Sequence, residues 1–418
     1  MDKLKININE MLESISNAQD LVSPRLSNHH QQVAYLAFRL AEHIGLPFEQ
    51  QKDVYLAGLL HDIGALSTPE RLELLESEPV NVHYHGFSGA KLLEGFMPLK
   101  EPAYIIKYHH LPWNHGEGRA FNDEEVSIAS HIIHLADRTC ASIRSGENVI
   151  VQKNRILPAI RKQAGAKFEP DLVDALCELC SIESIWLDLV SDEPIRMISD
   201  PGLLNIHTSE IDDVIDLAFI FSHIIDFRSR FTSLHSAGVA KTAEKLAQII
   251  GFSPFECKMM LIAGYLHDFG KIAINSQILE KEGKLTEDEF NTIRVHTYYT
   301  YRLLEPIKQL QTVNIWASYH HEKLDGTGYP FHISGDSLPL GSRIMAVADI
   351  FAAITEDRPY RKGMDYAGAK RVLEEKVADN SIDRSVVNTL LENFGEINSI
   401  REQAQAEAAE HYEKFMRQ

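Results

Sequence analysis

The sequence is poor in cysteine and has no long apolar segment. Its 418 residues include four cysteines, Cys140, Cys177, Cys180 and Cys257, and so few thiols favour a reducing compartment over a disulfide framework. No apolar run approaches the ~20 residues that a membrane helix needs. The N-terminus also lacks the apolar core of a signal peptide. We therefore expect a cytoplasmic protein with no membrane partner.

Basic residues are outnumbered as well. The chain has 41 Lys and Arg against 60 Asp and Glu, a formal net charge of −19, and such a surface repels the phosphates of nucleic acids. This argues against a nucleic-acid polymer as a partner. Hydrophobic residues at 44% and charged residues at 24% are typical of globular chains, which excludes a disordered protein. Histidine is abundant instead, with 20 residues.

The sequence contains an internal duplication. A shift of 206 places residues 29–65 on 235–271 without a gap, with 15 identities in 37 positions. Apolar residues recur at helical spacing in 234–250 and 289–304, and strict alternation is rare. These patterns predict an all-α fold with two tandem helical bundle domains, 1–195 and 206–418, separated by turn-forming residues.

Each half carries the same ordered set of histidines and aspartates. A lone histidine on an apolar helix face is more often a core residue than a ligand. Seven such groups, however, would each cost about 1–3 kcal/mol if buried without partners, and imidazole and carboxylate bind transition metals. The pattern predicts a metal site in the core of each bundle. The sets are His29, His61, Asp62, His85, His109, His110 and Asp137 in the first half, and His235, His267, Asp268, His296, His320, His321 and Asp349 in the second.

Three motifs make the second half recognisable: HDFGK (267–271), HHEKLDGTGYP (320–330) and VADIFAAITEDRPYR (347–361). Over roughly 210–395 the chain resembles the HD-GYP subgroup of HD metal-dependent phosphohydrolases. The resemblance implies a phosphodiesterase for cyclic di-GMP, cyclic GMP-AMP or both, with divalent transition metals such as Fe or Mn. It implies one metal on His235, His267, Asp268 and Asp349, and a second on His296, His320 and His321 with Asp268 bridging. Two such ions ~3.5–4 Å apart lower the pKa of a shared water, which then attacks phosphorus as hydroxide.

The resemblance also implies the residues that contact the substrate. Lys271 would act with Asp268 in catalysis and reach a phosphate oxygen. The remaining contacts would be Asp325, Gly326, Gly328, Tyr329, Pro330, Arg358 and Arg361. Members with a third metal carry a Glu where this chain has Phe231, so we expect two ions.

The first half resembles the HD fold without the GYP motif. Ala65 stands at the position of Lys271, and Gly146 and Val149 stand at those of the two arginines. We expect a degenerate HD domain that is regulatory or joins the chain to a second copy or another protein. The alternative is an HD hydrolase with another substrate range.

Two other functions stay open for the second half. The pocket could serve a cyclic-dinucleotide receptor, or an HD hydrolase acting on nucleoside mono- or triphosphates. A complete ligand set with Lys271 favours an enzyme, and the GYP loop favours a cyclic dinucleotide substrate. The preferred dinucleotide and the metal are not determined by these residues.

Overall fold

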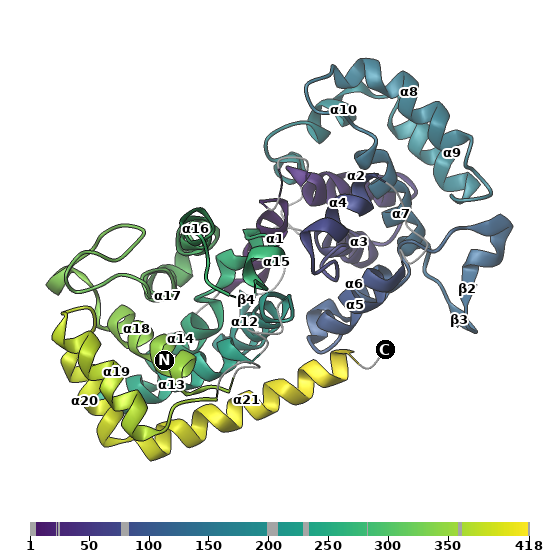
Figure 1. Ribbon diagram of the computed structural model, residues 1–418. Coiled ribbons are helices and arrows are strands. Elements are labelled where there is room, and N and C mark those ends of the chain that lie inside the picture. Colours follow the sequence, from purple (N-terminus) through teal and green to yellow (C-terminus); the bar gives the residue numbers. More distant parts are fainter. Residues whose placement is uncertain are drawn as a thin grey trace. The chain divides into compact units, whose positions relative to one another are not determined.

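The computed structural model describes residues 6–21, 23, 26–76, 83–198, 208–228, 234–281, 283–357 and 362–416. Most of them lie in helices, and the strands among them are two residues long (Figure 1). The predicted all-α fold is confirmed.

The chain divides into two compact units. One is Leu12–Ile206, and the other joins Met1–Met11 to His207–Gln418. The short segment belongs to the second unit because strand β1 (Ile6–Asn7) pairs antiparallel with β4 (Thr208–Ser209). We keep the limits 1–195 and 206–418 as a proposal for the two domains.

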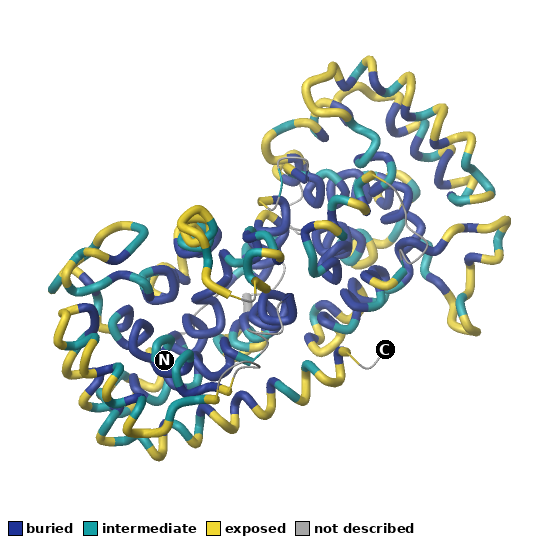
Figure 2. The backbone as a smooth tube through the Cα atoms, viewed as in Figure 1, coloured by how far each residue is buried: buried dark blue, intermediate teal, exposed yellow. Residues whose placement is uncertain are grey.

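The first unit is a helical bundle with one small hairpin. Its buried residues line the interior of the bundle (Figure 2). The helices are α1 (Ile8–Asp20, which begins in the second unit), α2 (His29–His43), α3 (Phe48–Leu60), α4 (Thr68–Glu76), α5 (His83–Leu93), α6 (Lys100–Lys107), α7 (Ile128–Ala141), α8 (Val149–Arg161), α9 (Pro170–Leu179) and α10 (Glu183–Leu189), and the hairpin is β2 (Ala120–Phe121) with β3 (Glu124–Glu125).

The second unit repeats the plan. Its helices are α12 (Ile211–Asp226), α13 (His235–Ile250), α14 (Pro254–Leu266), α15 (Ser276–Leu279), α16 (Glu287–Leu304), α17 (Gln311–Ser318), α18 (Leu340–Thr355), α19 (Tyr366–Ala378), α20 (Arg384–Glu392) and α21 (Phe394–Met416). The helices predicted in 234–250 and 289–304 are α13 and α16. Helix α14 stops at Leu266, and Gly270 lies in the 3-10 helix that follows, η5 (Phe269–Ala273).

Equivalent glycines bring equivalent helices close together. A Cβ atom on Gly58 of α3 would lie 2.6 Å from the Cα of Ala34 in α2. A Cβ atom on Gly264 of α14 would lie 2.3 Å from the Cα of Ala240 in α13. Real side chains do not tolerate such distances, so only glycine allows the backbones to approach. In each unit this contact lies one helical turn before the His-Asp pair.

Candidate metal centre

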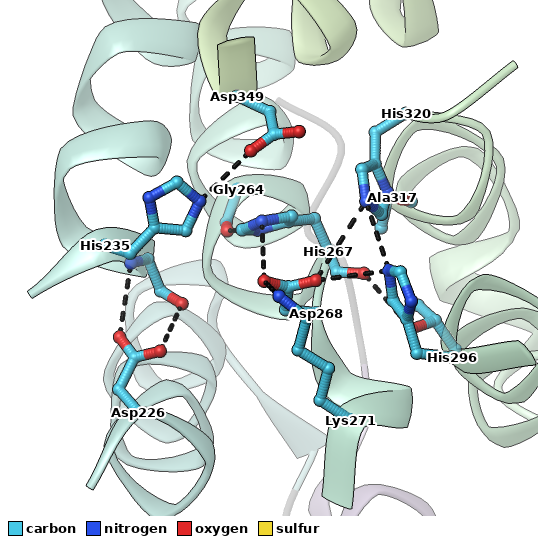
Figure 3. Close-up of polar contacts among 12 residues, drawn as sticks. Asp226, His235, Gly264, His267, Asp268, Lys271, His296, Ala317, His320 and Asp349 are labelled. Carbon is cyan, nitrogen blue, oxygen red and sulfur yellow. Dashed lines mark hydrogen bonds and ion pairs between the residues drawn. The ribbon is translucent and has the colours of Figure 1, made fainter. Parts of the chain in front are cut away.

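The second unit brings the seven predicted ligands to one place. They come from the start of α13, the end of α14, the middle of α16, the turn after α17, and α18. Figure 3 labels all of them except His321. Two groups have ligand atoms that all lie within 4.8 Å of one another. These groups are His235, His267 and Asp268, and His296, His320 and His321.

Asp268 lies between the two groups. Its Oδ2 atom is 3.2 Å from Nε2 of His267, and its Oδ1 atom is 3.3 Å from Nε2 of His296. Each carboxylate oxygen thus faces a different histidine, as a bridging ligand requires. The side chain is buried.

Three of the histidines are oriented by the backbone. Each places Nδ1 against the carbonyl oxygen three residues earlier: His267 on Gly264 at 2.7 Å, His296 on Ile293 at 2.6 Å and His320 on Ala317 at 2.6 Å. The carbonyl accepts, so Nδ1 carries the proton and Nε2 presents its lone pair to the centre. Nε2 of His267 is buried and makes no well-aligned hydrogen bond, although Oδ2 of Asp268 lies 3.2 Å from it. An imidazole in this tautomer, with a bare inward nitrogen, fits a metal ligand.

The protonation states of His296, His320 and Asp268 agree with that role. Burial lowers the pKa of His296 to about 3 and that of His320 to about 4, so both rings are neutral near pH 7. Burial alone would raise the pKa of Asp268, but His267 and Lys271 outweigh it and hold that pKa well below its usual range. Metal ligands must be unprotonated, and these three groups are. For His267 and His235, burial lowers the pKa but the neighbouring carboxylates raise it by more, so a metal ion that binds there would displace a proton.

His235 reveals a residue that sequence reasoning missed. Its Nε2 lies 3.0 Å from Oδ1 of Asp349, and its Nδ1 lies 3.2 Å from Oε2 of Glu356. Gln405 of α21 donates to the same Glu356 oxygen at 3.1 Å. Glu356 therefore orients His235, as a carboxylate behind a metal-binding histidine does. Its sequence signal is the spacing of seven residues, two helical turns, from Asp349.

Asp226 is a second missed residue. The backbone N–H and the hydroxyl of Ser236 donate to its carboxylate at 3.2 and 2.9 Å, next to His235. Burial raises the pKa of Asp226 to about 7. Asp20 stands 206 residues earlier, so the repeat itself carried a signal.

Lys271 lies beside the centre, where it was predicted. Its Nζ atom is 2.5 Å from Oδ2 of Asp268. Buried Arg228 holds the backbone around it, donating to the carbonyls of Lys271 at 3.0 Å, of Ile272 at 2.5 Å and of Ile274 at 3.1 Å. These contacts fix η5, from which Lys271 extends.

The GYP loop is shaped largely by contacts within itself. Asp325 is exposed, and its carboxylate accepts from the backbone N–H and the hydroxyl of Thr327, both at 2.8 Å. Gly326 has φ of 78°, and a Cβ atom on Gly328 would lie 2.4 Å from the backbone nitrogen of Lys323. Gly326 therefore adopts a left-handed backbone conformation that other residues rarely adopt, and Gly328 allows two backbone segments of the loop to approach closely.

Tyr329 of the loop lies against one of the ligands. Its ring centroid lies 5.0 Å from that of His321, and the guanidinium of Arg294 lies 4.6 Å above it. Pro330 follows it through a cis peptide bond. Arg358, Arg361 and Phe231 lie outside the described residues.

The first unit assembles its own predicted set. Asp62, His85, His109 and His110 form one group with ligand atoms within 4.8 Å, and His29, His61 and Asp137 form another. All seven are buried. His30, which was not predicted, groups with His61 and Asp62 in the same way.

Comparisons with known proteins agree with this geometry. Models of the HD domain match residues 26–142 and 220–386. 3'3'-cGAMP-specific phosphodiesterase 1 of Vibrio cholerae is 30% identical over 93% of this chain and 92% of its own length. The chain belongs to the HD phosphodiesterase family. The resemblance of its second half to HD-GYP enzymes is thereby confirmed.

Other known proteins match less of the chain or match it more distantly. The cyclic di-GMP phosphodiesterase response regulator RpfG of Xanthomonas campestris is 38% identical over 37% of this chain and 44% of its own length. The crystal structure of a cyclic GMP-AMP specific phosphodiesterase of V. cholerae, V-cGAP3, shares the fold with a TM-score of 0.64. V-cGAP3 is 22% identical to this chain, and the match covers 94% of this chain and 98% of the V-cGAP3 chain. Among the described residues, no helix is long and apolar enough to cross a membrane.

Proposed function

We propose that this HD phosphodiesterase hydrolyses cyclic di-GMP, 3'3'-cGAMP or both at the centre of its second half. The observation that carries the proposal is Asp268, whose two oxygens face two histidine groups beside Lys271. The relatives' names support the substrate class, because phosphodiesterase 1 is named for 3'3'-cGAMP and RpfG for cyclic di-GMP.

Two divalent transition metals fit the residues present. His235, His267, Asp268 and Asp349 would hold one, and His296, His320 and His321 would hold the other with Asp268 shared. When bound, such ions supply Lewis-acid chemistry and lower the pKa of the attacking water. Iron or manganese is our proposal for their identity, since imidazole and carboxylate suit both.

The protein's own side chains would then position the phosphate. Lys271 has three N–H donors and gives one to Asp268, which leaves others for a phosphate oxygen. Tyr329 would close the site beside His321, and Arg358 and Arg361 would contribute further positive charge. The GYP residues Asp325, Gly326, Gly328 and Pro330 would hold Tyr329 in place through the loop contacts described above.

The first half has a supporting role in this proposal. We infer that it regulates the second half or joins it to a second copy or another protein. A cytoplasmic location is proposed as well, supported by four cysteines that are all free.

The test is incubation of purified, metal-analysed protein with both cyclic dinucleotides, followed by chromatography of the products. Asp268→Ala removes the shared ligand, so turnover should fall at least 100-fold and bound metal should decrease. Asp336→Asn, at a fully exposed carboxylate, is the matched control and should retain activity. Full activity in metal-stripped Asp268→Ala protein would contradict the proposal.

A further inference from the structure

Arg71 of α4 is a buried cation with unused hydrogen-bond donors. Its side chain is 1% exposed, and its Nε–H donates to the carbonyl of Ala65 at 2.7 Å. Its two terminal nitrogens are buried without a hydrogen-bond partner, and no described carboxylate lies within ion-pair distance. A guanidinium has five N–H donors, and burying a charge without partners is costly. Four of the five N–H donors of Arg71 therefore have no acceptor among the described residues.

The location of Arg71 corresponds to that of Lys271. Ala65 is the residue equivalent to Lys271, and its N–H donates to the carbonyl of Asp62 at 2.9 Å. Arg71 therefore reaches the same turn after the His-Asp pair from a different helix. Burial lowers the pKa of Arg71 to about 10 while Asp62 and Glu70 oppose that shift, so the group is charged at neutral pH.

Bracing of the backbone accounts for only one of the five donors. In the second unit Arg228 braces the equivalent turn, and it uses both terminal nitrogens on carbonyl oxygens. Arg71 braces Ala65 through Nε alone. Its terminal nitrogens form the planar fork that binds two oxygens of a phosphate.

We propose that the first domain binds a phosphate group between its histidine cluster and Arg71. The proposal rests on the metal ligation inferred for that cluster, because metal ions would hold the other phosphate oxygens. It assigns a phosphate-binding cation to a domain in which Ala65 stands at the position of Lys271. Positional comparison missed Arg71 because the cation comes from α4 and not from the turn itself.

The ligand of this site is small. The side chain of Asp137 is 1% exposed against 13% for its equivalent Asp349. Arg71 is buried, whereas Lys271 is only partly buried. A site this closed suits inorganic phosphate or the phosphate end of a nucleoside monophosphate better than a whole cyclic dinucleotide.

The experiment uses the full chain carrying His267→Ala and Asp268→Ala, which disables the second centre. The protein is loaded with Mn²⁺, and paramagnetic relaxation of phosphorus in inorganic phosphate or in GMP reports binding near the metal. Arg71→Gln in this background should bind phosphate at least 10-fold more weakly with unchanged metal content. Arg161→Gln, an exposed arginine paired with Asp174, is the matched control and should bind as the background does.

The outcomes separate the possibilities. Tighter binding of GMP than of inorganic phosphate would identify a nucleotide ligand, and the reverse would identify free phosphate; either supports the proposal. Absence of binding in the background, equal binding by Arg71→Gln, or joint loss of metal and phosphate would overturn it. If Arg71→Gln does not fold, Arg71→Lys replaces it. This variant should bind phosphate at least 3-fold more weakly, because an ammonium lacks the planar fork that binds two phosphate oxygens at once. Unchanged binding overturns the proposal. Hydrolysis by the wild-type protein is measured separately, so its failure is distinguishable from failure here.

Discussion

Five buried histidines use the same backbone contact, three in the second unit and two in the first. In the first unit, Nδ1 of His61 lies 2.9 Å from the carbonyl oxygen of Gly58, and Nδ1 of His109 lies 2.7 Å from the carbonyl oxygen of Ile106. The helix carbonyl three residues earlier thus sets the ring orientation and the tautomer without a metal. Ligands held in this way lose little conformational freedom when an ion binds.

Glu356 should matter although it is not a proposed ligand. Glu356→Ala removes the carboxylate behind Nδ1 of His235, so metal affinity should fall about 10–100-fold, the range typical of such outer partners. Glu356→Gln keeps a hydrogen-bond acceptor but loses the charge, so its metal affinity should lie between that of the wild type and that of Glu356→Ala. Metal titration measured beside kcat and KM tests this.

The control for this series is Glu374→Gln on the exposed face of α19, which should match wild type. Wild-type metal affinity in Glu356→Ala would show that His235 is oriented by Asp349 alone.

The ligands could be predicted from the sequence, whereas the sequence offers only a weak signal for their supports, such as the seven-residue spacing of Glu356 from Asp349, and none for the contacts that they make. The ligands repeat in order in both halves, and the HD and GYP motifs are local. Glu356 and His235 are 121 residues apart, and Glu356 and Gln405 are 49 apart. No local pattern indicates such contacts, which exist only once α13, α18 and α21 have packed.

At the scale of elements, a second glycine in each half lets the turn after the His-Asp pair pack on a helix. A Cβ atom on Gly270 would lie 2.0 Å from the carbonyl oxygen of His296 in α16. The equivalent atom on Gly64 would lie 2.1 Å from the carbonyl oxygen of His85 in α5. The close contact holds the His-Asp turn against the next ligand.

Gly270→Ala should therefore destabilise the second unit. The contact with backbone cannot be relieved by a rotamer change, so we expect a loss of about 2 kcal/mol or more and lower metal content. Gly395→Ala in α21 has open space around its Cβ position and should be neutral or slightly stabilising. Thermal unfolding measures both, and equal melting temperatures would show that α16 moves aside at little cost.

Helix α12 contributes a pH-dependent term through His223. Burial lowers the pKa of this histidine from 6.5 to about 3, with a smaller effect of His411. Below pH 6.5 the unfolded chain binds a proton that the folded form does not, so stability falls as the pH drops from about 6.5 toward 3. At pH 5 the loss is about 2 kcal/mol.

His223→Leu removes that titration. Between pH 7 and 5 the free energy of unfolding of this variant should decline less than that of the wild type, with a difference of up to ~2 kcal/mol. Urea unfolding at each pH measures both. His332→Asn, at an exposed histidine, should follow the wild-type pH profile. An unchanged slope in His223→Leu would show that His223 is protonated in the folded protein.

At the scale of the whole molecule, the duplication explains why the fold was predictable. Helical spacing, the repeated His-Asp sets and the turn-rich segment between the halves all point to two bundles. The pairing of β1 with β4 was not predictable, because strands of two residues leave no alternation to detect. The placement of Met1–Met11 with the second unit depends on that pairing.

The division of labour between the halves can be tested with matched double variants. His267→Ala with Asp268→Ala removes the shared ligand next to Lys271 and the GYP loop, so hydrolysis of a cyclic dinucleotide should be eliminated. His61→Ala with Asp62→Ala removes the equivalent pair from a closed site without a GYP loop, so hydrolysis should persist while bound metal decreases. Each variant needs a melting curve beside its rate, since removing buried ligands can unfold a domain. A folded first-half variant that loses all turnover would place the first domain in catalysis, because loss of stability would then be excluded as the cause.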